Sequence, residues 1–195
     1  MKKGIAVLFM MLVFCFASIV SAFEFSSDVV MTTRNHVTNS KMYIKDKKIR
    51  METKGQPSYS IVRGDKNVVW MVMPSQKMYM EIKPDPSQNP KTEEKIKGEV
   101  SRKLIGSETI GGHPTQKYEV TVKSGGKMEK MYQWMATDIK FPVKTAAIDG
   151  SWVTEYKNIK MGGQPDSLFE VPAGYTKRTM PAMPRGMKTP KAPRE

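Results

Sequence analysis

Short segments in which apolar and polar residues alternate dominate this sequence from residue 23 onward, and turn-forming residues separate them. The pattern is clearest in residues 23–33, 41–53 and 59–73, where lysines and β-branched residues stand between apolar positions. Alternation with a period of two is typical of β-strands that bury one face and expose the other. Turns are expected at Asp46-Lys47 and Gly64-Asp65. The sequence therefore predicts a chain that is mainly β.

Two further hairpins are predicted in the second half of the chain. Gly125-Gly126 and Asp149-Gly150 are dipeptides that favour two-residue turns between strands. A turn at Asp149-Gly150 places Lys144 opposite Glu155, and this pair of opposite charges supports the register.

One helix is predicted, over residues 92–104. Residues 84–90, PDPSQNP, precede it and are expected to form a loop, because proline lacks the amide donor that a strand interior needs. Thr92 is a suitable N-cap, although Gly98 within the segment weakens the helical pattern. The apolar residues of the segment recur at intervals of four, namely Ile96, Val100 and Leu104.

The first 22 residues have the three parts of a secretory signal peptide. Two lysines precede an apolar run from Ile5 to Val20, and small residues end the segment at Ala22. The run is short for a membrane-spanning helix. Cys15 lies in the middle of the run and does not follow small residues, so a lipid anchor is not expected. We expect cleavage after Ala22 and a soluble protein of a bacterial periplasm.

Removal of 22 of the 195 residues leaves 173 residues without cysteine, which is enough for one domain, predicted over residues 23–175. Residues 176–195 contain six basic residues, four prolines and one acid, the composition of a disordered tail. The net charge of +13 falls to +11 when two lysines are removed. This excess suggests anionic envelope surfaces as partners, although lysines that merely keep the surface soluble explain it equally well. Nucleic acid is not an expected partner, because no binding motif is present.

The residues that catalysis would need are sparse. The two histidines, His36 and His113, are far apart in the sequence, and no serine lies in a nucleophile elbow. The segment IGGHP at 110–114 lacks the lysine and the helix of a phosphate-binding loop. No catalytic residue, cofactor or metal ligand is predicted, and we expect a protein that is not an enzyme.

Methionine is frequent, with 17 residues in the chain and 14 after removal of Met1, Met10 and Met11. The segment VVWMVMPSQKMYMEI, residues 68–82, is predicted to be a hairpin that turns at Ser75-Gln76. Because side chains alternate along a strand, its register places six candidate ligand-lining residues on one face. These are Val69, Met71, Met73, Met78, Met80 and Ile82. The opposite face carries Trp70, Val72, Tyr79 and Glu81.

Three interpretations of this methionine cluster remain open. Thioethers bind Cu(I), but no histidine or cysteine lies nearby. Methionine is also unbranched and polarizable, so the cluster could line a deformable site for an apolar ligand. Ordinary hydrophobic core is the third interpretation, and burial energy does not separate it from the second, since a buried methionine contributes ~1.5–3 kcal/mol in both.

Five segments together resemble a bacterial exported family, the domain of unknown function 4412. In chain order they are KMYIKDKKIRMET, IVRGDKNVVWMVMPSQKMYMEI, GSETIGGHPTQKYEV, FPVKTAAIDGSWVTEYKNIK and DSLFEVPAGY. The resemblance covers about residues 23–180, and the tryptophan-methionine hairpin and LFEVPAGY are its most specific parts. This family is similar to the periplasmic lipoprotein carriers of LolA type.

The resemblance implies a strongly curved antiparallel sheet, an unclosed half-barrel with helical material in its concave mouth. In the carriers this cavity binds the acyl chains of lipoproteins, which would make the methionine cluster a cavity wall. The carriers begin with a helix that helps to cover the cavity. Here the predicted mature chain begins on a strand, FEFSSDVV, and only residues 92–104 are left to cover the concave face.

The sequence therefore predicts non-catalytic binding of an apolar or amphipathic ligand, such as an acyl chain, a lipid or a lipid-modified protein. The alternative is a structural or sensory envelope interaction module, whose concavity is filled by its own side chains and whose basic tail docks on anionic partners. A Cu(I) site is the third hypothesis.

Overall fold

The computed structural model describes residues 23–84, 95–96 and 98–179, and within them twelve strands form one sheet. The strand order is β12-β6-β5-β4-β3-β2-β1-β11-β10-β9-β8-β7, and the pairs are antiparallel except for β12 and β6. The strands are β1 (Glu24–Thr33), β2 (His36–Lys45), β3 (Lys48–Thr53), β4 (Tyr59–Arg63), β5 (Val68–Met73), β6 (Met78–Ile82), β7 (Glu99–Ile110), β8 (His113–Ser124), β9 (Lys127–Ala136), β10 (Phe141–Ala147), β11 (Trp152–Met161) and β12 (Thr176–Arg178). Two short 3₁₀ helices are η1 (Pro74–Gln76) and η2 (Asp166–Phe169).

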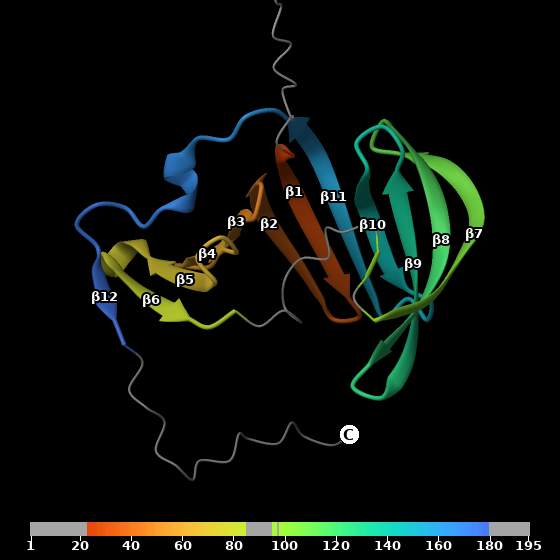
Figure 1. Cartoon of the computed structure of the whole chain (residues 1–195), viewed down its shortest axis with the longest axis horizontal. Coiled ribbons are helices and arrows are strands. Elements are labelled where there is room, and N and C mark those ends of the chain that lie inside the picture. The colour runs from red at the N-terminus through yellow and green to blue at the C-terminus, as the bar shows by residue number, and fades with distance from the viewer. Residues whose placement is uncertain (1–22, 85–94, 97, 180–195) are drawn as a thin grey trace, which may run out of the picture.

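The sheet is open and curved, with β1, β2 and β11 at its centre, β3–β6 and β12 to one side and β7–β10 to the other (Figure 1). The rings of Phe25 in β1 and Phe141 in β10 lie 4.8 Å apart, centroid to centroid. In a flat sheet these two strands would be about 10 Å apart, because β11 lies between them. The sheet therefore curls toward the face that carries these rings, which we call the inner face. The predicted mainly β, unclosed half-barrel is confirmed.

Most of the predicted hairpins are present with the predicted register. Gly125 and Gly126 alone connect β8 to β9, where Ser124 pairs with Lys127. Lys144 pairs with Glu155 as predicted, although the connection between β10 and β11 comprises four residues, 148–151. Connections of two and four residues give the same register, so the wrong loop length left the pairing unchanged.

The predicted helix over residues 92–104 is wrong, since residues 99–104 lie in β7; residues 92–94 and 97 are outside the described part. Gly98 has φ +84°, which cannot continue a right-handed helix. Val100 and Ile105 stand where the β7–β8 register shifts, so bulges interrupt the alternation of the strand. Of the three residues whose spacing suggested a helix, Val100 and Leu104 lie in this bulged strand, and Ile96 precedes it.

The end of the described chain also differs from the prediction. Residues 176–178, which the sequence assigned to the tail, form β12 and pair with Met78–Met80 of β6. The rest of the predicted tail, the predicted signal peptide and most of the 84–90 loop lie outside the described residues. The described part of the chain contains no helix with the length and hydropathy that a membrane span requires.

Gly98 should tolerate alanine less well than Gly112, which has nearly the same φ, +87°. A Cβ at position 98 would lie 2.7 Å from the carbonyl oxygen of Lys123, whereas one at position 112 meets nothing within 4 Å. Gly112→Ala should therefore lower the free energy of unfolding by about 1–2 kcal/mol, because alanine is strained in the left-handed conformation. Gly98→Ala should cost at least about 1 kcal/mol more, because of the clash. Equal losses in the free energy of unfolding by urea would contradict this account.

Candidate ligand-binding face

The β5–β6 hairpin has the predicted register. Met73 pairs with Met78, Met71 with Met80, and Val69 with Ile82, so all six candidate residues share one face. The connection consists of four residues, η1 and Lys77, and is centred on the predicted turn at Ser75-Gln76, with Lys77 at φ +49°. Each of the six side chains is half-buried.

Four of the six residues, Val69, Ile82, Met71 and Met80, belong to two apolar rows that cross the sheet on its inner face. Direct cross-strand pairing defines each row over β1 to β6. The first row is Phe25, Ile44, Ile49, Val62, Val69 and Ile82. The second is Ser27, Met42, Met51, Ser60, Met71 and Met80. We call the parts of these rows on β3–β6, together with Met73 and Met78, the methionine face.

Burial changes along both rows. Phe25 and Met42 are fully buried, where the curled sheet brings them into one core cluster with Phe141 of β10. From β3 to β6 the residues of both rows are only half-buried. The inner face is thus closed by the protein's own side chains at β1 and β2, and it remains partly accessible over β3–β6.

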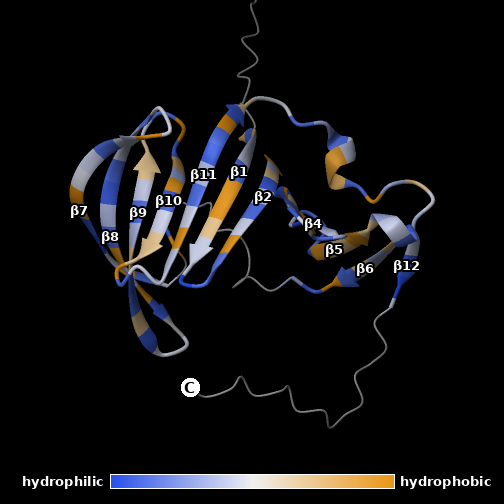
Figure 2. Cartoon of the chain, turned by 180° about the vertical axis from the view of Figure 1, so that it is seen from behind, coloured by the Kyte–Doolittle hydropathy of each residue, from blue (hydrophilic) through white to orange (hydrophobic). Residues whose placement is uncertain are grey.

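The opposite, outer face of the same strands is covered by a segment that we call the C-terminal strap, residues 162–175. Phe169 of η2 is fully buried in a cluster with Ile61, Trp70 and Val72. In Figure 2 the hydrophobic part of η2 lies on the side of β4 and β5. Trp70, Val72 and Tyr79, which the sequence placed on the face opposite the methionines, therefore pack under the strap.

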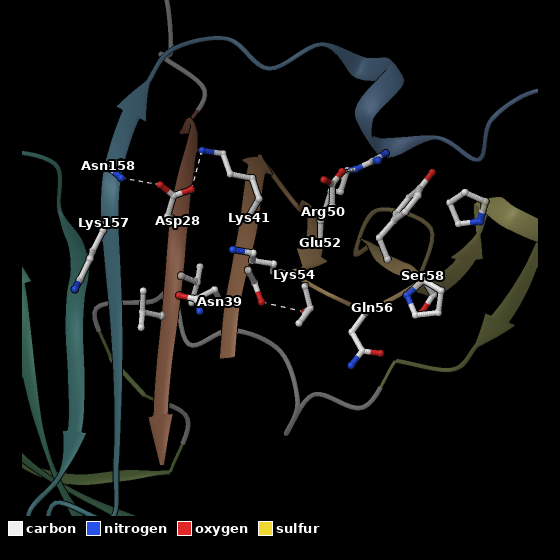
Figure 3. Close-up of a pocket in the computed structure, with 17 residues that line it drawn as sticks. Asp28, Asn39, Lys41, Arg50, Glu52, Lys54, Gln56, Ser58, Lys157 and Asn158 are labelled. Atoms are coloured by element: carbon white, nitrogen blue, oxygen red, sulfur yellow. Dashed lines mark hydrogen bonds and ion pairs between the residues drawn. The ribbon is translucent and has the colours of Figure 1, made fainter. Parts of the chain in front are cut away.

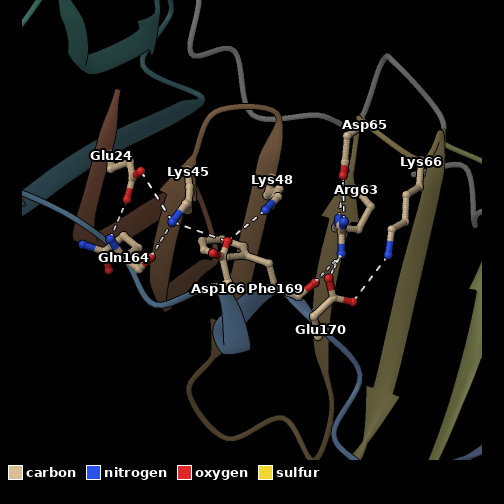
Figure 4. Close-up of polar contacts among 10 residues, drawn as sticks. All are labelled: Glu24, Lys45, Lys48, Arg63, Asp65, Lys66, Gln164, Asp166, Phe169 and Glu170. Carbon is tan, nitrogen blue, oxygen red and sulfur yellow. Dashed lines mark hydrogen bonds and ion pairs between the residues drawn. The ribbon is translucent and has the colours of Figure 1, made fainter. Parts of the chain in front are cut away.

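A buried arginine anchors the strap. Arg63 donates two hydrogen bonds to Asp65, Nε to Oδ1 at 2.8 Å and Nη2 to Oδ2 at 2.7 Å. Its Nη1 donates to the carbonyl oxygen of Phe169 at 3.1 Å and forms an ion pair with Glu170 (Figure 4). The guanidinium is 4% exposed, so its charge depends on these partners. The hydrogen bond from Arg63 lowers the pKa of Asp65 to about 2.

The start of the strap is held by lysines of the β2–β3 hairpin (Figure 4). Lys48 and Lys45 approach Asp166 at 3.0 and 3.4 Å, and both lower the pKa of that carboxyl. Glu24 accepts a hydrogen bond from the amide of Gln164 at 2.6 Å. The strap is thus fixed to β1, β2, β3 and β4, which keeps it on the outer face.

A pocket of about 800 Å³ lies beside the 54–58 loop (Figure 3). Asp28, Lys41, Glu52 and Tyr59 of its wall are paired in one row with Val72, so this wall belongs to the outer face. None of the six candidate residues lines it. Its wall is largely polar and includes Asp28, Asn39, Ser40, Lys41, Arg50, Glu52, Thr53, Lys54, Ser58 and Lys157. Sequence reasoning missed this pocket, because its residues come from five separate segments.

Sequence reasoning also missed Met42 and Met51. They pair directly, and Met51 lies across Ser60 from Met71. The alternation in KMYIKDKKIRMET would have placed both on one face of their hairpin. Only the order of strands in the sheet joins that hairpin to β5 and β6, and alternation alone does not give this order.

No candidate catalytic or metal centre emerges from the described residues. His113 approaches Asp138 at 2.7 Å from Nδ1 to Oδ2, and His36 is exposed at the start of β2. Within the described ranges, no three or more His, Cys, Asp or Glu side chains are grouped so that they could hold a metal ion. Burial raises the pKa of the Tyr156 hydroxyl to about 12, which keeps it neutral at physiological pH.

These features define an open, curved antiparallel sheet with one covered face and one accessible apolar face. A family model for the domain of unknown function DUF4412 matches residues 23–140. The match spans more than half of the chain, so the protein belongs to this family, as the sequence motifs predicted. The sequence has no match among curated proteins.

Solved structures are similar to this chain at low sequence identity. MucB has a TM-score of 0.54 at 14% identity, over 77% of this chain and 58% of that chain. The MucA/MucB complex of Pseudomonas aeruginosa gives 0.50 at 14% identity, over 74% and 54%. Lipoprotein LppX of Mycobacterium tuberculosis gives 0.43 at 15% identity, over 69% and 84%. This chain thus spans less than two thirds of the MucB chains, and the similarity shows the fold alone.

The stability of the folded protein should fall at acid pH partly because of Asp65, which binds the arginine that anchors the strap. Its pKa is about 2 in the folded chain, against an ordinary value of 3.8. The carboxylate therefore contributes stability that is present above about pH 4 and is lost as the pH falls toward 2. Asp65→Asn should flatten the decline of the urea midpoint over this range. Asp46→Asn, in an exposed turn, is the control and should leave the decline unchanged; an unchanged decline in Asp65→Asn would contradict the assignment.

Proposed function

We propose that the methionine face binds an apolar or amphipathic ligand, such as an acyl chain, a lipid or a lipid-modified protein, without catalysing its conversion. The observation that carries the proposal is the difference between the two faces of β3–β6. Trp70 and Val72 on the outer face are buried under the strap, whereas Met71 and Met80 on the inner face are only partly buried. A contiguous apolar surface of this kind typically marks an interaction site.

The residue types on this face suit a ligand of variable shape. Methionine is flexible and polarizable, so a surface with five methionines adapts to different chains more readily than one built of branched residues. The wall contains Met51, Met71, Met73, Met78 and Met80. Serine occurs between them only at position 60, where its small side chain leaves space between Met51 and Met71.

Export to the periplasm is part of the proposal and rests on the predicted signal peptide. A periplasmic protein of this fold would meet lipids and lipoproteins in transit between membranes. The MucA/MucB complex provides a second kind of partner, because there a protein of similar fold is bound to another protein. A lipid-modified protein would combine both kinds of contact.

Protein purified from its native envelope should carry extractable lipid, which mass spectrometry of an organic extract would detect. The purified chain should also bind a fluorescent fatty-acid probe. Protein that carries no lipid and binds no probe would contradict the proposal and favour the envelope interaction module. In that case the binding to anionic surfaces should depend on residues 176–195, which a truncated chain would test.

Polar substitutions on the methionine face should weaken binding of the probe. Replacing Met71 and Met80 by glutamine keeps their size but leaves two amides to be buried beneath an apolar chain, at about 1–3 kcal/mol each without hydrogen bonds. The double variant should therefore bind at least about tenfold more weakly, since 1.4 kcal/mol corresponds to a factor of ten. Fluorescence titration gives the dissociation constants.

Met128→Gln is the matched control, because Met128 is 56% exposed on β9 and lies outside the methionine face. It should leave probe binding unchanged. Equal effects of the control and the double variant would show that the probe binds elsewhere. Urea unfolding of each variant separates weaker binding from loss of the fold.

A further inference from the structure

The methionine face borders the point where the C-terminal chain leaves the described part of the structure. The strap on the outer face ends at residue 175, and β12 then joins the edge of the sheet beside β6 (Figure 1). The amide of Thr176 donates to the carbonyl oxygen of Lys77 at 2.9 Å, which fixes the start of β12. The chain has thus passed from the outer face to the sheet edge next to Met78 and Met80.

The last residues of β12 extend the methionine face by one strand. Arg178 pairs with Met80, so its side chain lies on the inner side of the sheet. There its Nε donates to Sδ of Met78 at 2.8 Å. Lys177 lies on the outer side instead, where it forms an ion pair with Glu81. The side chains of β12 therefore alternate in step with those of β6.

The sequence that follows β12 has the composition of an occupant for this face. Residues 180–187, MPAMPRGM, contain three methionines and two prolines, and no charged residue precedes Arg185. Methionine adapts its shape to an apolar surface, and here that surface is itself rich in methionine. Proline restricts the unbound chain, so less conformational entropy is lost when the segment binds. We call residues 180–187 the methionine-proline segment.

The methionine-proline segment is long enough to cross the face. From β6 to β3 the face spans three strand spacings, or about 14 Å. A proline-rich chain extends by about 3.1 Å per residue, so eight residues reach about 25 Å. A segment tethered this close to its site has an effective concentration in the millimolar range. Even a weak apolar contact would therefore keep the face occupied for much of the time.

We propose that the methionine-proline segment occupies the methionine face of its own chain and competes there with the ligand. The inference rests on the proposed function and adds an internal regulator to it. None of the residues that form the methionine face is charged, so the face offers no carboxylate to the basic residues of the tail. The competition is therefore apolar, and added salt should leave it in place.

Titration with the fluorescent fatty-acid probe tests the competition in two chains that both begin at residue 23. One extends to residue 195, and the other ends at Thr179 and so keeps the described residues of the domain, including β12. The longer chain should bind the probe at least about tenfold more weakly. This factor is expected when the segment occupies the face for about nine-tenths of the time, because only the remaining tenth of the molecules is then competent to bind.

Two triple variants of the longer chain separate apolar competition from an effect of charge. The first removes the three methionines of the segment and should bind the probe as tightly as the chain that ends at Thr179. Its substitutions are Met180→Ser, Met183→Ser and Met187→Ser. The control removes three tail charges, keeps the methionines and should bind as weakly as the unaltered longer chain. Its substitutions are Arg185→Gln, Lys188→Gln and Lys191→Gln.

Disulfide formation locates the segment without any ligand, in the chain that begins at residue 23 and so lacks Cys15. Met183→Cys is combined either with Met80→Cys or with Glu81→Cys. These two positions are neighbours on β6 and lie at the same distance along the chain from the tail, but they point to opposite faces. The pair with Met80→Cys should form its disulfide at least about tenfold faster, as measured by electrophoresis without reductant.

The outcomes separate the two proposals. Equal probe affinities of the longer and shorter chains, with equal disulfide rates, would overturn the internal regulator and leave the proposed function standing. If neither chain binds the probe, the proposed function and the competition are both overturned, and a fast disulfide with Met80→Cys would then show a face filled by its own tail. An affinity difference that grows with protein concentration would place the tail on a second copy and would overturn the inference.

Discussion

The buried guanidinium of Arg63 determines which face of the sheet is accessible. It joins a strand of the first half of the chain to the C-terminal strap through the Phe169 carbonyl and the Glu170 carboxylate. Loss of these partners would leave a charge buried without compensation, so the strap and the arginine stabilise one another. With the strap fixed on the outer face, the apolar rows of β3–β6 are left uncovered on the inner one. The proposed ligand site is thus a consequence of where the strap lies.

Local features of this fold were predictable, because hairpin register follows from alternation and turn position. The pairs Met71–Met80 and Lys144–Glu155 were predicted from the sequence, although the loop between β10 and β11 is longer than predicted. The β7 strand was not predictable in this way. Its bulges at Val100 and Ile105 shift the alternation, and the remaining spacing of apolar residues matches that of a helix. Only the pairing with β8 shows that this segment is a strand and not a helix.

The strap and the pocket were not predictable, for a different reason. Each depends on residues that are distant in the sequence, such as Arg63 and Phe169, and no local pattern records such contacts. Their composition gives no signal either, since a strap with one buried phenylalanine and a loop with one exposed lysine look like ordinary surface segments. The six candidate lining residues could be predicted from the alternation of side chains within one hairpin. The rest of the methionine face could not be predicted, because it depends on the order of the strands in the sheet.

The pairing of β1 with β11 has a consequence for how the chain reaches its final form. These strands join residues 24–33 to residues 152–161, so one edge of β1 stays unpaired until nearly the whole domain has been synthesised. Contacts over such sequence separations are formed late and slow the folding of β proteins. During this interval Val29 and its neighbours offer an open strand edge next to an apolar face, which favours wrong pairing between chains. The central position of β1 therefore makes the nascent protein dependent on being kept apart from its copies until its C-terminal third has emerged.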